Sequence, residues 1–340
     1  MLAACGGIFL TFLAIQFGAI ALVRPFESAG YQTVPNPQNP ANSVLYIGIL
    51  LAATAIILVA LRYGGRLLLR AFILLTGGML AVYVFSVLPG LTLGGVNVVP
   101  WLAAAVLVGA LVVYPEWWVV DLAGVVMGIG TAALFGISFG LLPAILLLGA
   151  LAVYDAISVY GTEHMLTLAS GVVELRVPVL LVYPTTWGFS FRERAAEMAE
   201  RAAAGGDERA EPGDEDVERG EEDRAEASGP PETAAGDGGR DSIMIGLGDA
   251  VMPTVMVASA TFFVPQIAPQ VPLVAGVALP AVTALVGTLL GLGVLLRMVL
   301  AGRAHAGLPL LNGGAILGYF LGALAAGIHP VTALGLGPYL

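Results

Sequence analysis

Uninterrupted apolar stretches of about 20 residues recur along this chain of 340 residues, and they constrain its fold more than any other feature. A helix needs about 20 apolar residues to cross the roughly 30 Å hydrocarbon core of a bilayer. The stretches are too long and too continuous for the alternating strands of a transmembrane barrel. Only 11% of the residues are charged, well below the usual level of a soluble domain. The sequence therefore predicts an all-α membrane protein.

Nine transmembrane helices can be drawn as a bundle, in three parts of the chain. Residues 1–160 hold the first six helices, 161–241 form a cytoplasmic loop, and 242–340 hold the last three. The eighth helix contains Pro280, which predicts a kink or a later start. The expected helices are Leu2–Val23, Val44–Leu61, Leu67–Leu88, Val98–Tyr114, Trp117–Ile137, Leu141–Tyr160, Ser242–Val264, Val271–Leu300 and Leu308–Ile328.

The long loop has two parts of different character. Residues 171–187 are apolar and rich in valine, but too short and too interrupted by proline to span, so we expect a strand or an interfacial segment. Residues 192–241 contain 17 Asp or Glu and 7 Arg, with almost no large apolar side chains, and should be disordered or transiently helical. A solvated linker is the favoured role, and docking of a substrate or partner is the alternative. The remaining chain holds 7 acids and 7 Arg, so the net charge of −10 belongs to this loop. It indicates neither a basic ligand for the whole protein nor a nucleic-acid partner.

Arginines in the short loops predict the orientation, because positive residues are enriched in cytoplasmic loops. They follow the second and eighth helices, whereas the odd-numbered loops contain a single Arg. The N-terminus should then be cytoplasmic and the C-terminus outside, in a multi-pass protein of the cell membrane. The arginines are Arg62, Arg66 and Arg70, then Arg297 and Arg303, and finally Arg24 in the first loop.

Two aspartates stand alone inside apolar segments: Asp155 in ALAVYDAISVY and Asp249 in IMIGLGDAVMP. An ionised carboxylate in hydrocarbon costs at least a few kcal/mol, and such residues mark functional sites. Counted from the expected helix ends, Asp155 lies about 8 Å and Asp249 about 10 Å below the cytoplasmic face. Because the two helices run antiparallel, the carboxylates should lie at similar depth and form one site.

Two carboxylates that approach a common water cannot both be ionised at neutral pH, so they hold one proton between them. One then acts as a base that activates the water, and the other as an acid that protonates a peptide carbonyl. The sequence assigns neither role to a particular aspartate. This is the arrangement of an aspartic protease, and it needs no metal or other cofactor.

Other polar residues are weaker candidates. Gln16 and Asn312 are neutral groups expected to hydrogen-bond to neighbouring helices, and Asp121 lies close to Glu116 near a cytoplasmic helix end, where a structural role is favoured. No HExxH helix, Cys/His metal-ligand spacing or Ser beside a membrane-embedded His is present. Two rival classes remain. A proton-coupled transporter could use the same two carboxylates, and an interaction protein could use them to join two helices.

Two motifs make the chain resemble the presenilin and signal peptide peptidase family of intramembrane aspartyl proteases. Tyr154-Asp155 matches the family's YD in the sixth helix, and Gly246-Leu247-Gly248-Asp249 matches its GxGD in the seventh. Nine helices and a long hydrophilic loop between the motifs match as well. The family's Pro-Ala-Leu motif is imperfect here, since the chain reads Ala306-Gly307-Leu308-Pro309-Leu310. The resemblance implies Asp155 and Asp249 as catalytic residues and Leu308, Pro309 and Leu310 as substrate-binding residues.

The resemblance also implies an activity, the cleavage of single-span proteins within the membrane. A cytoplasmic N-terminus agrees with the presenilin branch, and the chain resembles a microbial homologue that acts without accessory subunits. The implied partners are the transmembrane helices of substrates and the lipid bilayer. Whether copies of the chain associate as a homo-oligomer is left open. A proline at the start of the ninth helix leaves backbone groups free, so this stretch is also expected to pair with an unwound substrate.

Overall fold

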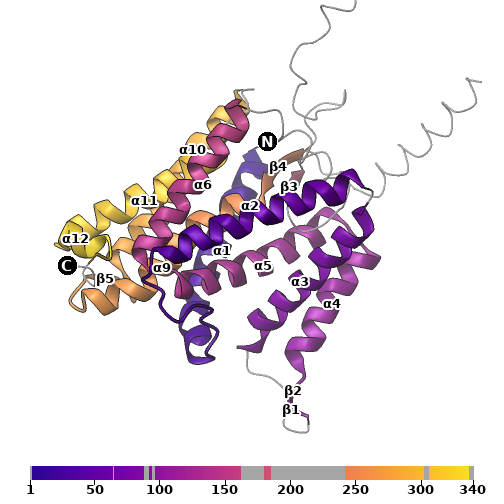
Figure 1. Ribbon diagram of the computed structural model, residues 1–340, viewed down its shortest axis with the longest axis horizontal. Helices are drawn as coiled ribbons and strands as arrows, with labels where there is room; N and C mark the ends of the chain where they lie inside the picture. The colour runs from indigo at the N-terminus through magenta and orange to yellow at the C-terminus, as the bar shows by residue number, and fades with distance from the viewer. Residues whose placement is uncertain are drawn as a thin grey trace, which may run out of the picture.

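The computed structural model is a bundle of helices with three short β-hairpins (Figure 1). It describes residues 2–63, 65–87, 92–93, 96–161, 180–184, 242–301 and 306–336. The acidic segment 192–241, expected to be a linker, lies outside these residues. The predicted helical membrane fold is confirmed, and the hairpins are additions that hydropathy did not indicate.

Six long helices form the first half of the bundle, each made of a mainly apolar segment. They are α1 (Leu2–Ser28), α2 (Ala41–Arg62), α3 (Arg66–Ser86), α4 (Val99–Val113), α5 (Trp117–Ser138) and α6 (Leu141–Gly161). Between α3 and α4 lies a small hairpin of β1 (Thr92–Leu93) and β2 (Val96–Asn97).

The second half contains α9 (Leu247–Ile267), α10 (Leu279–Leu300), α11 (Gly307–Ala325) and the short α12 (Pro330–Ala333). The eighth expected helix starts late, as Pro280 suggested. Residues 273–278 form the hairpin of β5 (Leu273–Val274) and β6 (Val277–Ala278), and Pro280 lies in the first turn of α10. There its missing N–H breaks no helical hydrogen bond.

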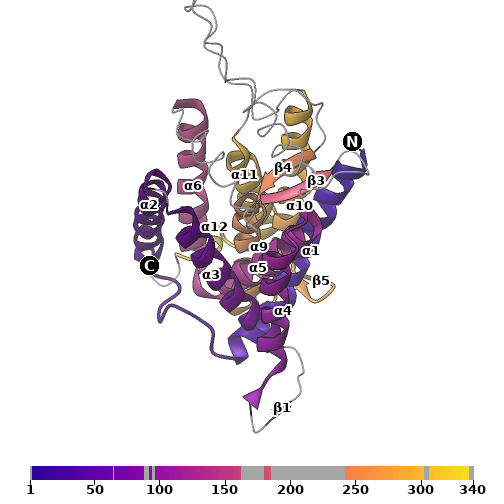
Figure 2. The ribbon, with the colours of Figure 1, turned by 90° about the vertical axis from the view of Figure 1, so that its right-hand side faces the viewer.

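Eight of these helices are long and apolar enough to cross a membrane, counted over the part of the chain that the structure describes. The expected fourth span, α4, has 15 residues and is therefore about 22 Å long. Helix α4 starts at the end of the α3–α4 pair where the β1–β2 hairpin lies, and it finishes at the opposite end of the pair (Figures 1 and 2).

Helix α9 forms the centre of the bundle. In the most apolar 18-residue stretch of α9, 72% of the residues are buried, whereas 6% are buried in the corresponding stretch of α2, which lies at the edge of the bundle. It packs against α1, α5, α6, α10 and α11. Its apolar side chains join α1, α5, α6 and α11 in one core cluster that includes Phe26, Ile137, Leu148, Met256 and Tyr319. The residues that precede α9 are thus fixed to the most buried part of the molecule.

The third hairpin replaces the predicted start of the seventh helix. Strand β3 (Leu180–Pro184) pairs antiparallel with β4 (Ser242–Gly246), so that Val182 lies opposite Met244. The sequence placed Ser242–Gly246 inside a helix because the apolar run continues into α9. The strand prediction for the valine-rich segment is borne out for Leu180–Pro184, and its other residues lie outside the described chain. Figures 1 and 2 place this hairpin at the end of the bundle where α1 begins.

Helices α10 and α11 make the closest helix pair. A Cβ added at Gly287 would collide with the backbone of Gly314, and one added at Gly318 would collide with the backbone at Thr283. Small residues allow backbones in a membrane to approach this closely. The contact fixes the position of α11, whose N-terminus carries part of the candidate site.

Candidate active site

Asp155 lies on α6 and caps a different helix. Its Oδ2 accepts a hydrogen bond of 3.0 Å from the backbone N–H of Leu308, and the N–H of Gly307 also faces this carboxylate. These two residues open α11, and the residue before them, Ala306, has no side chain that can cap the helix. The first N–H groups of a helix have no partner within it and attract negative charge. Asp155 therefore supplies the missing cap across 153 residues of sequence.

Asp249 lies in the first turn of α9, directly after strand β4. Its carboxylate faces the backbone N–H of Gly246, the N-cap residue of its own helix. A Cβ added at Gly307 would lie 3.3 Å from Asp249 Oδ2, so the carboxylate lies against the glycine that begins α11. The glycine leaves the room that this carboxylate occupies.

Both carboxylates thus converge on Gly307, Asp155 also binds the N–H of Leu308, and the two carboxylates interact electrostatically with one another. The predicted start of the seventh helix was wrong, because α9 begins at Leu247 and not at Ser242. The carboxylate is the third residue of the helix rather than two turns inside it. The partnership of the two aspartates did not depend on that depth, since antiparallel α6 and α9 bring them to the same end of α11.

The other motif residues have distinct positions. Gly246 ends β4 opposite Leu180, and a Cβ added to it would lie 3.3 Å from Asp249 Oδ2. Leu247 packs towards Gly128 of α5. Gly248 faces open space, and Tyr154 is 41% exposed. The residues of the GxGD motif therefore shape the turn from strand to helix around Asp249. The ring of Tyr154, in the YD motif, faces the outside.

Leu308, Pro309 and Leu310 are half-buried and belong to the first turns of α11. The stretch is helical from Gly307 onward, and the N–H of Leu308 is bonded to Asp155. It therefore does not present an extended edge to a substrate in this structure. The sequence reasoning did not single out Gly307, because a glycine carries no side chain whose chemistry could indicate a site.

Two further polar groups hold the elements around the site. Asn312, one turn beyond Leu308, is fully buried and donates from Nδ2 to the carbonyl of Leu148 on α6 at 3.0 Å, which confirms its predicted link to a neighbouring helix. Asp121 of α5 accepts a hydrogen bond of 2.8 Å from the N–H of Val182 in β3.

Gln16 is buried, but neither of its side-chain atoms has a hydrogen-bond partner among the described residues. Over the same residues no group of three His, Cys, Asp or Glu lies together as a metal site requires.

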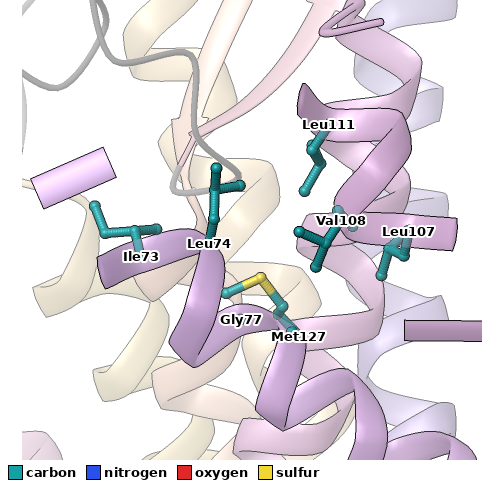
Figure 3. Close-up of a pocket in the computed structure, with 9 residues that line it drawn as sticks. Ile73, Leu74, Gly77, Leu107, Val108, Leu111 and Met127 are labelled. Carbon is teal, nitrogen blue, oxygen red and sulfur yellow. The ribbon is translucent and has the colours of Figure 1, made fainter. Parts of the chain in front are cut away.

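An apolar hollow with about 210 Å³ of empty space, part of it open to the outside, lies between α3, α4 and α5 (Figure 3). Met127 and Gly77 face one another across it, and it has no polar lining. It comes from different helices than the two carboxylates and offers no group for acid–base chemistry. The pair of aspartates at the start of α11 is therefore the candidate active site.

Comparisons with known proteins show the family to which the chain belongs. The family described as signal-peptide peptidase, presenilin aspartyl protease matches residues 9–328. A crystal structure of a presenilin family intramembrane aspartate protease in the C222 space group is 34% identical, with a TM-score of 0.62 over 95% of this chain and 99% of that one. A second, in the P2 space group, is also 34% identical, with a TM-score of 0.59 over 94% and 97%. A comparison with curated sequences gave no match. The chain belongs to the signal-peptide peptidase and presenilin family of intramembrane aspartyl proteases.

Proposed function

We propose that this protease hydrolyses peptide bonds within the transmembrane segments of single-span proteins, with Asp155 and Asp249 as its two catalytic residues. The observation that carries the proposal is the convergence of both carboxylates on Gly307, where they interact with one another. No other pair of carboxylates from different spanning helices meets in this way among the described residues. We place the protein in the cell membrane, and the arginine pattern puts its N-terminus in the cytoplasm.

The chemistry requires one water and one shared proton. The ionised aspartate takes a proton from the water as the water oxygen bonds to the peptide carbonyl carbon, and the protonated aspartate gives its proton to the carbonyl oxygen. The C–N bond then breaks as the nitrogen receives the proton that was taken from the water, while a hydroxyl of the tetrahedral intermediate returns its proton to the other aspartate, which leaves a carboxylic acid and an amine. Backbone N–H groups of Gly307 and Leu308 hold one carboxylate in place throughout.

The substrate must unwind before it can be cut, because a helix uses its carbonyls in internal hydrogen bonds. Strand addition at a sheet edge would hold an unwound segment extended. In an antiparallel pair, opposite residues alternate between those that bond to each other and those that do not. Val182 donates to Asp121 and not to β4, so Val182 and Met244 form a non-bonded pair. The N–H and C=O of Met244 then face outward on the β4 side.

The outer edge of β4 is therefore the proposed docking edge for the substrate. Met244 is 40% exposed, whereas Val182 on the opposite edge is 3% exposed. Gly246 ends the same strand and Asp249 follows within one helical turn, so a segment held along β4 leads directly to the carboxylates. Leu308, Pro309 and Leu310 contribute side-chain contacts on the far side of the aspartates.

Cleavage of a single-span reporter by the purified protein in liposomes tests the proposal. Asp155→Asn and Asp249→Asn keep an oxygen that can accept the local backbone hydrogen bonds, so both variants should fold, and each should lose at least about a thousandfold in rate. A double variant should be no worse than either single one, because the two residues act as a unit. Proton flux without fragments would instead indicate a transporter, and intact reporter without flux a protein that only binds.

A further inference from the structure

We infer that Asp121 is a positioning residue: it occupies the outer edge of β3 so that the β3–β4 hairpin offers a substrate only the edge of β4. The inference deepens the proposed function and rests on it for its effect on cleavage. The contact itself can be tested without any substrate. It concerns a carboxylate that the hydrolysis described above does not use.

The backbone N–H at the outer edge of β3 needs a hydrogen-bond partner. Val182 is buried, and an N–H removed from water without a hydrogen bond costs about 1–3 kcal/mol. The neighbour on that side is helix α5, which packs directly on β3. Backbone carbonyls of a helix are engaged within it, so a helix can satisfy a strand edge only through a side chain. Asp121 does so, with Oδ1 at 2.8 Å from the N–H of Val182.

Helix α1 also holds β3 in place. Tyr183 packs against Gly7 of α1, where an added Cβ would lie 3.1 Å from its ring, and its hydroxyl lies near Thr11. Burial keeps the pKa of this phenol above its ordinary range, and the nearby Asp121 raises it further. The phenol is therefore neutral and adds no second charge beside the carboxylate.

The outer edges of β3 and β4 differ in how accessible they are to a substrate. A strand edge with unpaired N–H and C=O groups recruits any extended segment, and proteins block edges with inward-pointing charges. Asp121 and α5 close the edge of β3, whereas Met244 leaves the edge of β4 accessible. A substrate bound to β3 would lie one strand further from Asp249, which continues directly from β4. Asp121 therefore selects the edge from which the carboxylates can be reached.

Substitutions at both ends of the hydrogen bond give the test. Asp121→Asn retains a carbonyl oxygen as acceptor, whereas Asp121→Leu removes it. Val182→Pro removes the donor but none of the β3–β4 bonds, because its N–H points away from β4, and a proline is tolerated at such an edge. Leu181→Pro is the matched control, because its N–H points into the hairpin and its loss should open the ladder.

We expect Asp121→Asn to cleave the reporter within about threefold of the parent. Asp121→Leu and Val182→Pro should each raise KM about tenfold or more, with a smaller change in kcat, and spread the cut over several positions. The variant that combines Asp121→Leu with Val182→Pro should have the same KM and cut positions as each single variant, because both substitutions remove the same hydrogen bond. Hydrogen exchange of the peptide that contains Val182 should quicken in Asp121→Leu but not in Asp121→Asn.

Three results would overturn the inference: cleavage lost in Asp121→Asn, unchanged KM and cut position in both Asp121→Leu and Val182→Pro, or additive effects in the double variant. Unchanged hydrogen exchange in Asp121→Leu would overturn the contact itself. Val182→Pro answers the question even if Asp121→Leu fails to fold, since it leaves α5 unchanged. Failure of the proposed function is distinct from all of these, because then the parent protein gives no fragments or Asp155→Asn still cleaves.

Discussion

At the scale of single residues, the proposed active site depends on a position that has no side chain. Gly307 opens α11, donates towards Asp155, and leaves the space next to Asp249. A methyl group there would lie 3.3 Å from Asp249 Oδ2 and 3.4 Å from a methyl carbon of Leu295. The 3.3 Å contact is tighter than usual, so one partner must shift by a few tenths of an ångström, and the carboxylate is the partner whose geometry the proposed chemistry needs.

Gly307→Ala should therefore lower kcat at least about tenfold, since small displacements of a catalytic group are costly. Gly313→Ala is the matched control. It lies in the same helix with open space around it, and there alanine should be neutral or stabilise by about 0.5–1 kcal/mol. Reporter cleavage and melting temperature of both variants check this. Equal activity of the two would show that Gly307 does not shape the site.

The sequence predicted the two aspartates because a carboxylate in an apolar helix is conspicuous. It did not predict the partner of Asp121, because Val182 is 61 residues away and the bond uses a backbone N–H that every residue but proline carries. The same reason hid the cap that Asp155 provides to α11. Side-chain chemistry is visible in a sequence, whereas backbone groups used across long separations are not.

At the scale of elements, strand β4 is where sequence reasoning and structure differ most. Ser242–Gly246 is as apolar as the helix that follows, and hydropathy alone does not separate a short buried strand from a helical turn. Its strand conformation depends on pairing with β3, which comes from a distant part of the sequence. The strand has a consequence that can be measured, since it supplies the proposed docking edge.

Met244→Pro removes the outward N–H of β4 and leaves the bonds to β3 in place. We expect kcat/KM to fall about tenfold or more, because one backbone hydrogen bond to an extended substrate is lost and a proline ring crowds the edge. The unfolding temperature should change little. A variant that cleaves as fast as the parent would move substrate docking away from β4.

The tight contact between α10 and α11 gives a stability prediction for the helices themselves. Gly287→Ala places a methyl group against the backbone of Gly314, and overpacking of this kind costs about 1–3 kcal/mol. Gly293→Ala, on the same helix, meets only Phe9 at an ordinary 3.7 Å and should be neutral. Thermal unfolding in detergent checks the pair. Equal melting temperatures would mean that the two helices are free to separate.

At the scale of the whole molecule, most of the bundle was readable because length and hydropathy determine which segments can span a bilayer. Eight helices meet that requirement among the described residues, and α4 is the short one. The orientation depends on whether α4 crosses: nine crossings put the two termini on opposite sides, and eight put them on the same side. We expect α4 to cross with local thinning of the bilayer, which costs fractions of a kcal/mol per Å.

Single cysteines in a Cys5→Ser background test this topology with a membrane-impermeant maleimide. Asn97→Cys, before α4, should react from outside the cell, and Tyr114→Cys, after α4, only once the cytoplasmic face is opened. Labelling of both from one side would mean that α4 does not cross. The C-terminus would then lie with the N-terminus.

We propose that Asp155 and Asp249 together split a peptide bond with one water. Cleavage of a single-span reporter in ¹⁸O-labelled water, read by mass spectrometry of the fragments, tests it most directly. We expect one fragment pair whose new carboxyl terminus carries ¹⁸O, absent from both Asp155→Asn and Asp249→Asn and retained in Asp121→Asn. Labelled fragments that persist in either aspartate variant would contradict it.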